Sequence, residues 1–178
     1  KKAIEEWKLD KVYKTRADKN HDSDPKLDSA VDRVDGIAFG LGTFRRNHTD
    51  KVRRCLDRGV HFRFITMDPE SEFVKQRSTE EGQPADAIEH SIHQLIDWAE
   101  KLNAEGHRGK ISIKGYKCMT LDFYWRIDDE VYMGPYWYGY LSSQTVTYKF
   151  VRGGLGYEMY KEYFDRLWED KDLMTDLV

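Results

Sequence analysis

The chain has 178 residues, of which 34% are charged and 39% are hydrophobic, and its formal net charge at pH 7 is −3. This length suggests one domain, or two small ones, and the aromatic residues can supply a core despite the many charges. A mildly acidic chain is not expected to coat nucleic acid, so we expect no bulk nucleic-acid binding. The absence of a long apolar run or a CxxC pair leads us to expect a cytoplasmic protein.

The first 25 residues are predicted to form an N-terminal helical segment and a linker, ahead of an α/β domain over 26–178. Residues 3–19 have a helix-like composition, and NHDSDP at 20–25 is rich in turn formers. The chain begins at Lys1 rather than Met, so we interpret it as an excised or processed piece. An upstream membrane anchor or DNA-binding segment stays open as an alternative.

The rest of the chain alternates between helical and strand patterns. Helices are predicted at 26–34, 46–59, 85–105 and 155–169. Strands are predicted at 36–44, 60–68, 110–117, 121–127, 130–136 and 143–151. A strand–helix–strand order with short connections implies parallel neighbours joined by a right-handed crossover. The sequence therefore predicts an α/β fold with a mixed, partly parallel sheet flanked by helices.

The stretch LDFYWRIDD is predicted to form one arm and the turn of a hairpin, with alternate residues on opposite faces. The core-facing set is Leu121, Phe123, Trp125 and Ile127, and the polar set is Asp122, Tyr124, Arg126 and Asp128. The polar face has two interpretations: a half-exposed strand with cross-strand pairs, or a floor that holds a ligand.

The turn GLGTFRRNHTD connects the first strand of the domain to a helix. Arg45 and Arg46 open that helix, although cations are unfavourable at a helix N-terminus. Such an exception often marks function, and the free N–H groups there suit a phosphate or carboxylate. The alternative is that both arginines face solvent or pair with Asp50. Asp68 follows the next strand, at the same edge of the sheet, whereas Ser71 is interpreted as a turn cap.

No recognisable catalytic or metal-binding signature is present. The sequence lacks a nucleophile elbow, an HExxH helix and a P-loop. His90 and His93 share a helix face, but no third ligand has suitable spacing. We therefore predict no catalytic residue, no metal and no cofactor.

The segments DGIAFGLGTF, GVHFRFITMDPES and RIDDEVYMGPYWYG resemble a phospholipase D-like domain, as does the closing helix YEMYKEYFDRLWED. The resemblance covers about residues 30 to 170. It implies a phospholipase D-like half-domain, in which a His-x-Lys pair normally precedes an Asp and a Gly-Ser follows.

The signature itself is lost. Anchoring on Asp128 places Leu121 and Phe123 at the histidine and lysine positions, whereas anchoring on Gly134 places Thr120 and Asp122 there. Neither register supplies the nucleophile or the phosphate-binding lysine, so the family's covalent mechanism is not expected. The closer resemblance is to degenerate single-copy bacterial members. It implies a sensory role for a nucleotide or another phosphorylated ligand, such as a cyclic nucleotide signal in bacterial defence.

We expect a non-catalytic, ligand-sensing domain with a nucleotide-like or other small anionic ligand. Since such pockets lie between two halves, a single half is expected to form a homodimer. Alternatives are a divergent phosphodiesterase or nuclease using His48 with Asp68, and an oligomerisation module. The candidate ligand-binding residues are Thr43, Arg45, Arg46, Asp68, Arg126, Asp128, Tyr136, Trp137, Tyr138, Ser143, Gln144 and Thr145.

Overall fold

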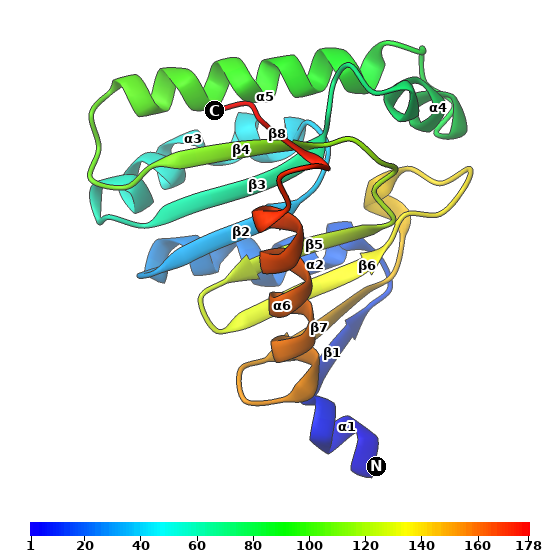
Figure 1. Cartoon of the computed structure of the whole chain (residues 1–178). Helices are drawn as coiled ribbons and strands as arrows, with labels where there is room; N and C mark the ends of the chain where they lie inside the picture. The colour runs from blue at the N-terminus through cyan, green and yellow to red at the C-terminus, as the bar shows by residue number, and fades with distance from the viewer.

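The computed structural model describes all 178 residues, and its centre is an eight-stranded mixed sheet (Figure 1). The order of the strands across the sheet is β1-β7-β6-β5-β2-β3-β4-β8. The strands are β1 (Leu9–Tyr13), β2 (Arg33–Ile37), β3 (His61–Met67), β4 (Ile111–Tyr116), β5 (Asp122–Ile127), β6 (Glu130–Pro135), β7 (Thr147–Val151) and β8 (Met174–Asp176). The α-helices are α1 (Lys2–Trp7), α2 (Arg16–Ser23), α3 (Gly42–Asp57), α4 (Glu72–Glu80), α5 (Ala87–Ala104) and α6 (Leu155–Glu169), and the 3₁₀ helices are η1 (Asp24–Ser29) and η2 (Ser142–Gln144).

Strands β2, β3 and β4 are parallel, whereas every other pairing in the sheet is antiparallel. Helix α3 connects β2 to β3, and α4 and α5 connect β3 to β4. The predicted fold class is confirmed: the sheet is mixed and partly parallel, and helices cover both faces. None of the helices is both long and apolar enough to cross a bilayer.

The two faces of the sheet bury separate apolar clusters. One face packs against α2, α3 and α5, through residues such as Leu27, Leu56 and Leu95. The other face packs against α6, where Tyr157 and Phe164 are buried. Figure 1 shows α6 alone crossing this second face. Because successive side chains of β5 point to opposite faces of the sheet, its apolar residues divide between the two clusters.

Three expectations about local structure are wrong. Residues 3–19 do not form a helix throughout, because 9–13 pair with β7 as an edge strand of the sheet. The first strand of the domain covers 33–37 rather than 36–44, only 26–29 of the helix expected at 26–34 are helical, as part of a 3₁₀ helix, and α3 begins at Gly42. The strand expected at 143–151 starts only at Thr147. In contrast, the hairpin and the last helix lie where they were predicted.

The turn between β2 and α3 passes very close to α5. A Cβ added at Gly40 would lie 1.7 Å from Ser91 Oγ and 2.6 Å from the Ser91 carbonyl oxygen. Only glycine fits this position without moving α5. The close approach fixes α5 beside the carboxyl end of β2, where ligands commonly bind in open α/β sheets.

Candidate functional site

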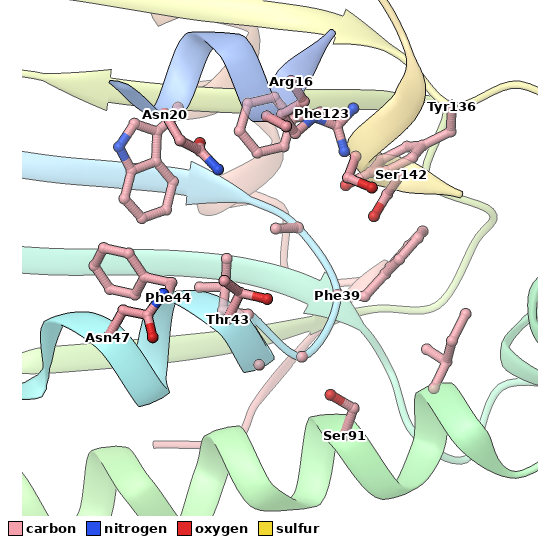
Figure 2. A pocket seen from close by; sticks show the side chains of 18 of the residues that line it. Arg16, Asn20, Phe39, Thr43, Phe44, Asn47, Ser91, Phe123, Tyr136 and Ser142 are labelled. Carbon is pink, nitrogen blue, oxygen red and sulfur yellow. The ribbon is translucent and has the colours of Figure 1, made fainter. Parts of the chain in front are cut away.

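A cavity of about 540 Å³ opens at the carboxyl end of β2 (Figure 2). Its walls come from α2, the turn over 38–44, the first turns of α5 and the loop after β6. Part of β5 closes it from the side of the sheet, through Phe123 and Trp125. The volume is within the range typical of small-molecule sites.

Helix α2 places two cations, Arg16 and Lys19, in this cavity one helical turn apart. Their exposed fractions are only 7% and 3%, and neither forms an ion pair. Arg16 donates from Nη2 to Thr145 Oγ1 at 3.2 Å, but its Nε is buried without a partner. Buried cations normally have an acidic partner, so this pair is an exception with a cost in stability.

The environment of the two cations changes their proton affinity. Burial lowers the pKa of Lys19 to about 7, and the nearby positive charge of Arg16 adds to this effect, whereas Asp24 opposes it. Burial also lowers the pKa of Arg16. A strongly shifted lysine in a cavity is typical of a functional site.

The two acids that line the cavity already have partners. Asp24 Oδ2 lies 2.9 Å from His48 Nε2. Glu81 accepts from Arg77 Nη2 at 2.8 Å, and Arg77 is itself almost fully buried. These acids are therefore bound to other side chains, and neither forms an ion pair with Arg16 or Lys19.

The N-terminus of α3 adds free donors to the same cavity. Leu41 is the N-cap residue in a left-handed conformation, with φ of 50°, and no side chain caps the helix. The first intrahelical acceptor is the carbonyl of Leu41, which bonds to Arg45 N at 2.9 Å. The N–H groups of Gly42, Thr43 and Phe44 therefore have no acceptor within the helix. Such groups, together with the helix dipole, favour an anion.

Aromatic rings form much of the remaining wall. The Arg16 guanidinium lies 3.9 Å from the centroid of Phe123 and 4.9 Å from that of Tyr136. Phe39 stacks on Tyr136 with centroids 4.6 Å apart, and Phe44 meets Trp125 edge-on at 5.0 Å. Figure 2 shows Arg16, Tyr136 and Ser142 together on one side, and Phe44 on the other. Cations beside flat apolar walls suit an anionic group attached to a ring.

Four of the twelve residues predicted from the sequence lie at this cavity. Thr43, Tyr136 and Ser143 line it, and Thr145 is the buried acceptor of Arg16. Trp137, Tyr138 and Gln144 belong to the same loop but do not line the cavity. Tyr138 is 80% exposed, and Gln144 Oε1 accepts from the N–H of Leu141.

The two arginines that open α3 do not line the cavity. Arg45 donates from Nε to the Gly40 carbonyl at 2.8 Å, so it supports the turn. Arg46 donates from Nη2 to Thr43 Oγ1 at 3.3 Å at the exposed surface. Asp68 is also elsewhere, where Oδ2 accepts from Thr175 Oγ1 at 2.7 Å. Ser71 caps α4, as the sequence indicated.

Arg126 lies beneath α6 rather than in a ligand floor. It donates from Nη1 to Asp35 Oδ2 at 3.2 Å, and Asp35 also accepts two hydrogen bonds from Arg63. Asp128 occupies the hairpin turn, where its carboxylate accepts from three backbone N–H groups over 31–33. On the polar face of β5, only Arg126 forms a cross-strand ion pair, with Asp35 of β2, and Tyr124 is buried with a hydroxyl group that has no hydrogen-bond partner. The interpretation as a half-exposed strand with cross-strand pairs therefore holds for the pairing of Arg126, but the strand is buried from Phe123 to Ile127.

Sequence reasoning missed the cavity residues Arg16 and Lys19, because both lie in the stretch that was assigned to a helical segment and linker. His48 was noticed, but it pairs with Asp24 and not with Asp68. One signal was available: Thr15 and Asp18 form a capping box, which marks the start of α2 immediately before the two cations.

The positions of the lost signature can now be located. Phe123, at the lysine position in one register, is buried in the cavity wall, and Leu121, at the histidine position, is 69% exposed. In the other register, Thr120 is buried and Asp122 lies beside Tyr160 in a different hollow. Both cations of α2 therefore stand against Phe123, the residue that the resemblance assigned to the lysine position in the first register.

No protein-family model matches the chain, and no curated protein matches it in sequence. Among solved structures, the chain is similar to TrmBL2, an archaeal chromatin protein with a novel mode of DNA binding, at 17% identity and a TM-score of 0.53. This similarity covers 89% of this chain and 52% of TrmBL2, so the chain spans about half the length of that protein. NucT from Helicobacter pylori is similar at 14% identity and a TM-score of 0.50, over 89% of this chain and 94% of NucT.

These similarities support the expected phospholipase D-like fold. They also correct one prediction. We excluded bulk nucleic-acid binding from the net charge of −3, but the same fold occurs in a chromatin protein that binds DNA. The overall charge of this chain is therefore not a valid reason to exclude nucleic acid.

Proposed function

We propose that the chain is a sensing domain whose cavity binds a small phosphate-containing ligand of the nucleotide class. The observation that carries this proposal is the pair Arg16 and Lys19, two buried cations without an ion-pair partner that face one cavity. An anion would supply the missing partner, and the free N–H groups of α3 would add donors. The aromatic walls would accommodate the ring system of a nucleotide.

We further propose that binding occurs without turnover. The residues at the two signature positions are Leu121 and Phe123 in one register, and neither can attack phosphorus or bind a phosphate oxygen. In the other register, Thr120 and Asp122 supply neither a histidine nor a lysine. His48 is near the cavity, but Asp24 holds its Nε2 and its Nδ1 is buried. A phosphodiester incubated with the protein, with and without divalent metal, should therefore stay intact.

Calorimetric titration with inorganic phosphate and a panel of mono- and cyclic nucleotides tests the proposal. Arg16→Met should weaken binding by about 10- to 100-fold, since a hydrogen bond to a charged group contributes about 1.5–3 kcal/mol. Arg46→Met is the matched control, because it removes an arginine at the exposed surface near the cavity. If no member of the panel binds, or both variants lose affinity equally, the proposal is wrong.

DNA binding is a second candidate, favoured by the fold shared with TrmBL2. It predicts affinity for duplex DNA that falls steeply as salt rises from 50 to 200 mM, because counterions are released on binding. Arg16→Met would leave such binding unchanged if DNA contacts the outer surface. Gel-shift titrations at both salt concentrations would separate this candidate from cavity binding.

A further inference from the structure

The two cations of the cavity face the same ring. Lys19 Nζ lies 5.1 Å from the centroid of Phe123, on which the Arg16 guanidinium also stands at 3.9 Å. Trp125 and Tyr132 complete an aromatic lining around Lys19, each 5.5 Å from Nζ. Lys19 forms no ion pair, and its repulsion with Arg16 is among the reasons for its lowered pKa. Two positive charges are therefore concentrated where no acid lies within ion-pair distance, although Asp24 opposes part of the shift in the Lys19 pKa.

Charge balance in such a cavity depends on the ligand. A phosphate diester carries one negative charge, so it would leave one buried cation uncompensated or require Lys19 to lose its proton. A phosphate monoester carries about −1.5 to −2 at pH 7, since its second pKa is about 6. A monoester would therefore offset both cations at once, and desolvated charges interact more strongly when they are paired.

From this placement we infer that the cavity selects a dianionic, terminal phosphate over a monoanionic phosphodiester, with Arg16 as the anchor and Lys19 as the specificity-determining residue. This inference rests on the proposed function and narrows its ligand to phosphate monoesters, such as nucleoside monophosphates. Arg16 binds either form, because its charge is permanent. Lys19 adds affinity only for a ligand that carries a second negative charge. Without that charge beside it, the protonated form of the buried Lys19 is unfavourable.

Phenyl phosphate and methyl phenyl phosphate test this inference, since they share a ring and differ by one charge. Affinities for the wild-type chain, Lys19→Met and Arg16→Met should be measured by calorimetry at pH 7. The wild type should bind the monoester about 10-fold more tightly, which corresponds to about 1.4 kcal/mol. Lys19→Met should lose most of this preference while its affinity for the diester stays within about 2-fold. Arg16→Met should weaken both.

The outcomes separate the inference from the proposed function. Equal affinity of the wild type for both probes, or an equal loss of both in Lys19→Met, overturns the inference and leaves anion binding intact. If neither probe nor inorganic phosphate binds, both proposals fail. Urea unfolding of Lys19→Met provides the control for folding, because removal of an unpaired buried charge should make the variant more stable and not less.

Discussion

The chain buries two groups of cations, one on each face of the sheet, and they differ in how their charge is offset. Beneath α6, Arg63 and Arg126 meet Asp35, and Arg63 also meets Asp165 at 2.9 Å. In the cavity, Arg16 and Lys19 have no acid within ion-pair distance. The paired group has a structural role, whereas the unpaired group is the one that we propose binds an anion. The proposed site therefore rests on the absence of an ion-pair partner, and not on the presence of charge.

Breaking the paired group should have the largest effect on stability. Asp35→Asn removes the carboxylate that Arg63 and Arg126 share, and leaves the buried Arg126 guanidinium with only the Asp32 carboxylate, 3.5 Å away. We expect a loss of about 3–5 kcal/mol in the free energy of unfolding, measured by urea titration. Glu162→Gln, which breaks the exposed pair with Arg166, should cost less than about 0.5 kcal/mol. Similar losses in both variants would contradict the comparison.

Removing a cation from the unpaired group should do the opposite. Lys19→Met is expected to raise the stability of the ligand-free chain by up to about 5 kcal/mol at pH 6, because burial lowers the pKa of Lys19 from 10.5 to about 7 and each unit corresponds to about 1.4 kcal/mol. The penalty is complete below pH 7 and is relieved as pH rises from about 7 toward the unfolded pKa near 10.5.

The pH dependence provides the check on this prediction. Wild-type stability should gain from Lys19 as pH increases from 7 to 10, and Lys19→Met should lack that contribution. Unfolding curves at pH 6, 8 and 10 for both proteins measure it. If the variant is less stable than the wild type at pH 6, contacts stabilise the charged lysine and its burial carries no net free-energy penalty.

A substitution in the cavity wall that changes no charge separates the effect of cavity shape from the effect of the unpaired cations. Gly40→Ala would place a methyl group against the backbone and side chain of Ser91, so α5 or the turn must move. We expect a loss of about 1–3 kcal/mol, together with weaker ligand binding. At Gly42 an added Cβ would meet only the flexible ends of Arg46 at 3.2 Å and Arg45 at 3.9 Å, so Gly42→Ala is the control for stability and should change the free energy of unfolding little.

The smallest effect concerns protons taken up on binding. An anion beside Lys19 favours its charged form, so a ligand-free pKa of about 7 should rise in the complex. Above pH 7, affinity should therefore fall by up to about 10-fold per pH unit, with uptake approaching one proton at pH 8. Calorimetry in two buffers of different ionisation enthalpy measures the uptake. Lys19→Met should abolish it, and unchanged uptake in that variant would assign the protons to another group.

Much of the fold could be predicted because it follows from local patterns. The alternation in LDFYWRI gave the two faces of β5, and the apolar stripe of α5 gave its boundaries within two residues. Strand β1 could not be predicted in this way, because LDKVY is short, polar and half exposed, and its pairing with β7 decides its conformation. Tertiary contact overrides weak local preference in such edge strands.

The site was harder to predict than the fold, for a physical reason. Whether a charged residue is a ligand partner depends on what lies opposite it, and this is set by strand register. Arg126 looked like a ligand partner until the antiparallel pairing of β2 with β5 placed Asp35 opposite it. Conversely, nothing in TRADKN indicates that Arg16 and Lys19 point into a cavity whose two acids, Asp24 and Glu81, are paired with other side chains. The cavity opens at the carboxyl end of β2, where we expected a site, but mostly other side chains line it.

Helix α2 holds its cations within eight residues that carry their own start signal, the capping box of Thr15 and Asp18. No residue of the sheet supplies a cation to the cavity. In the proposed site, both cations therefore come from one short helix, whereas Phe123 and Trp125 of the sheet supply apolar wall. Exchange of this helix is expected to change which ligands the cavity accepts while the β-scaffold stays intact.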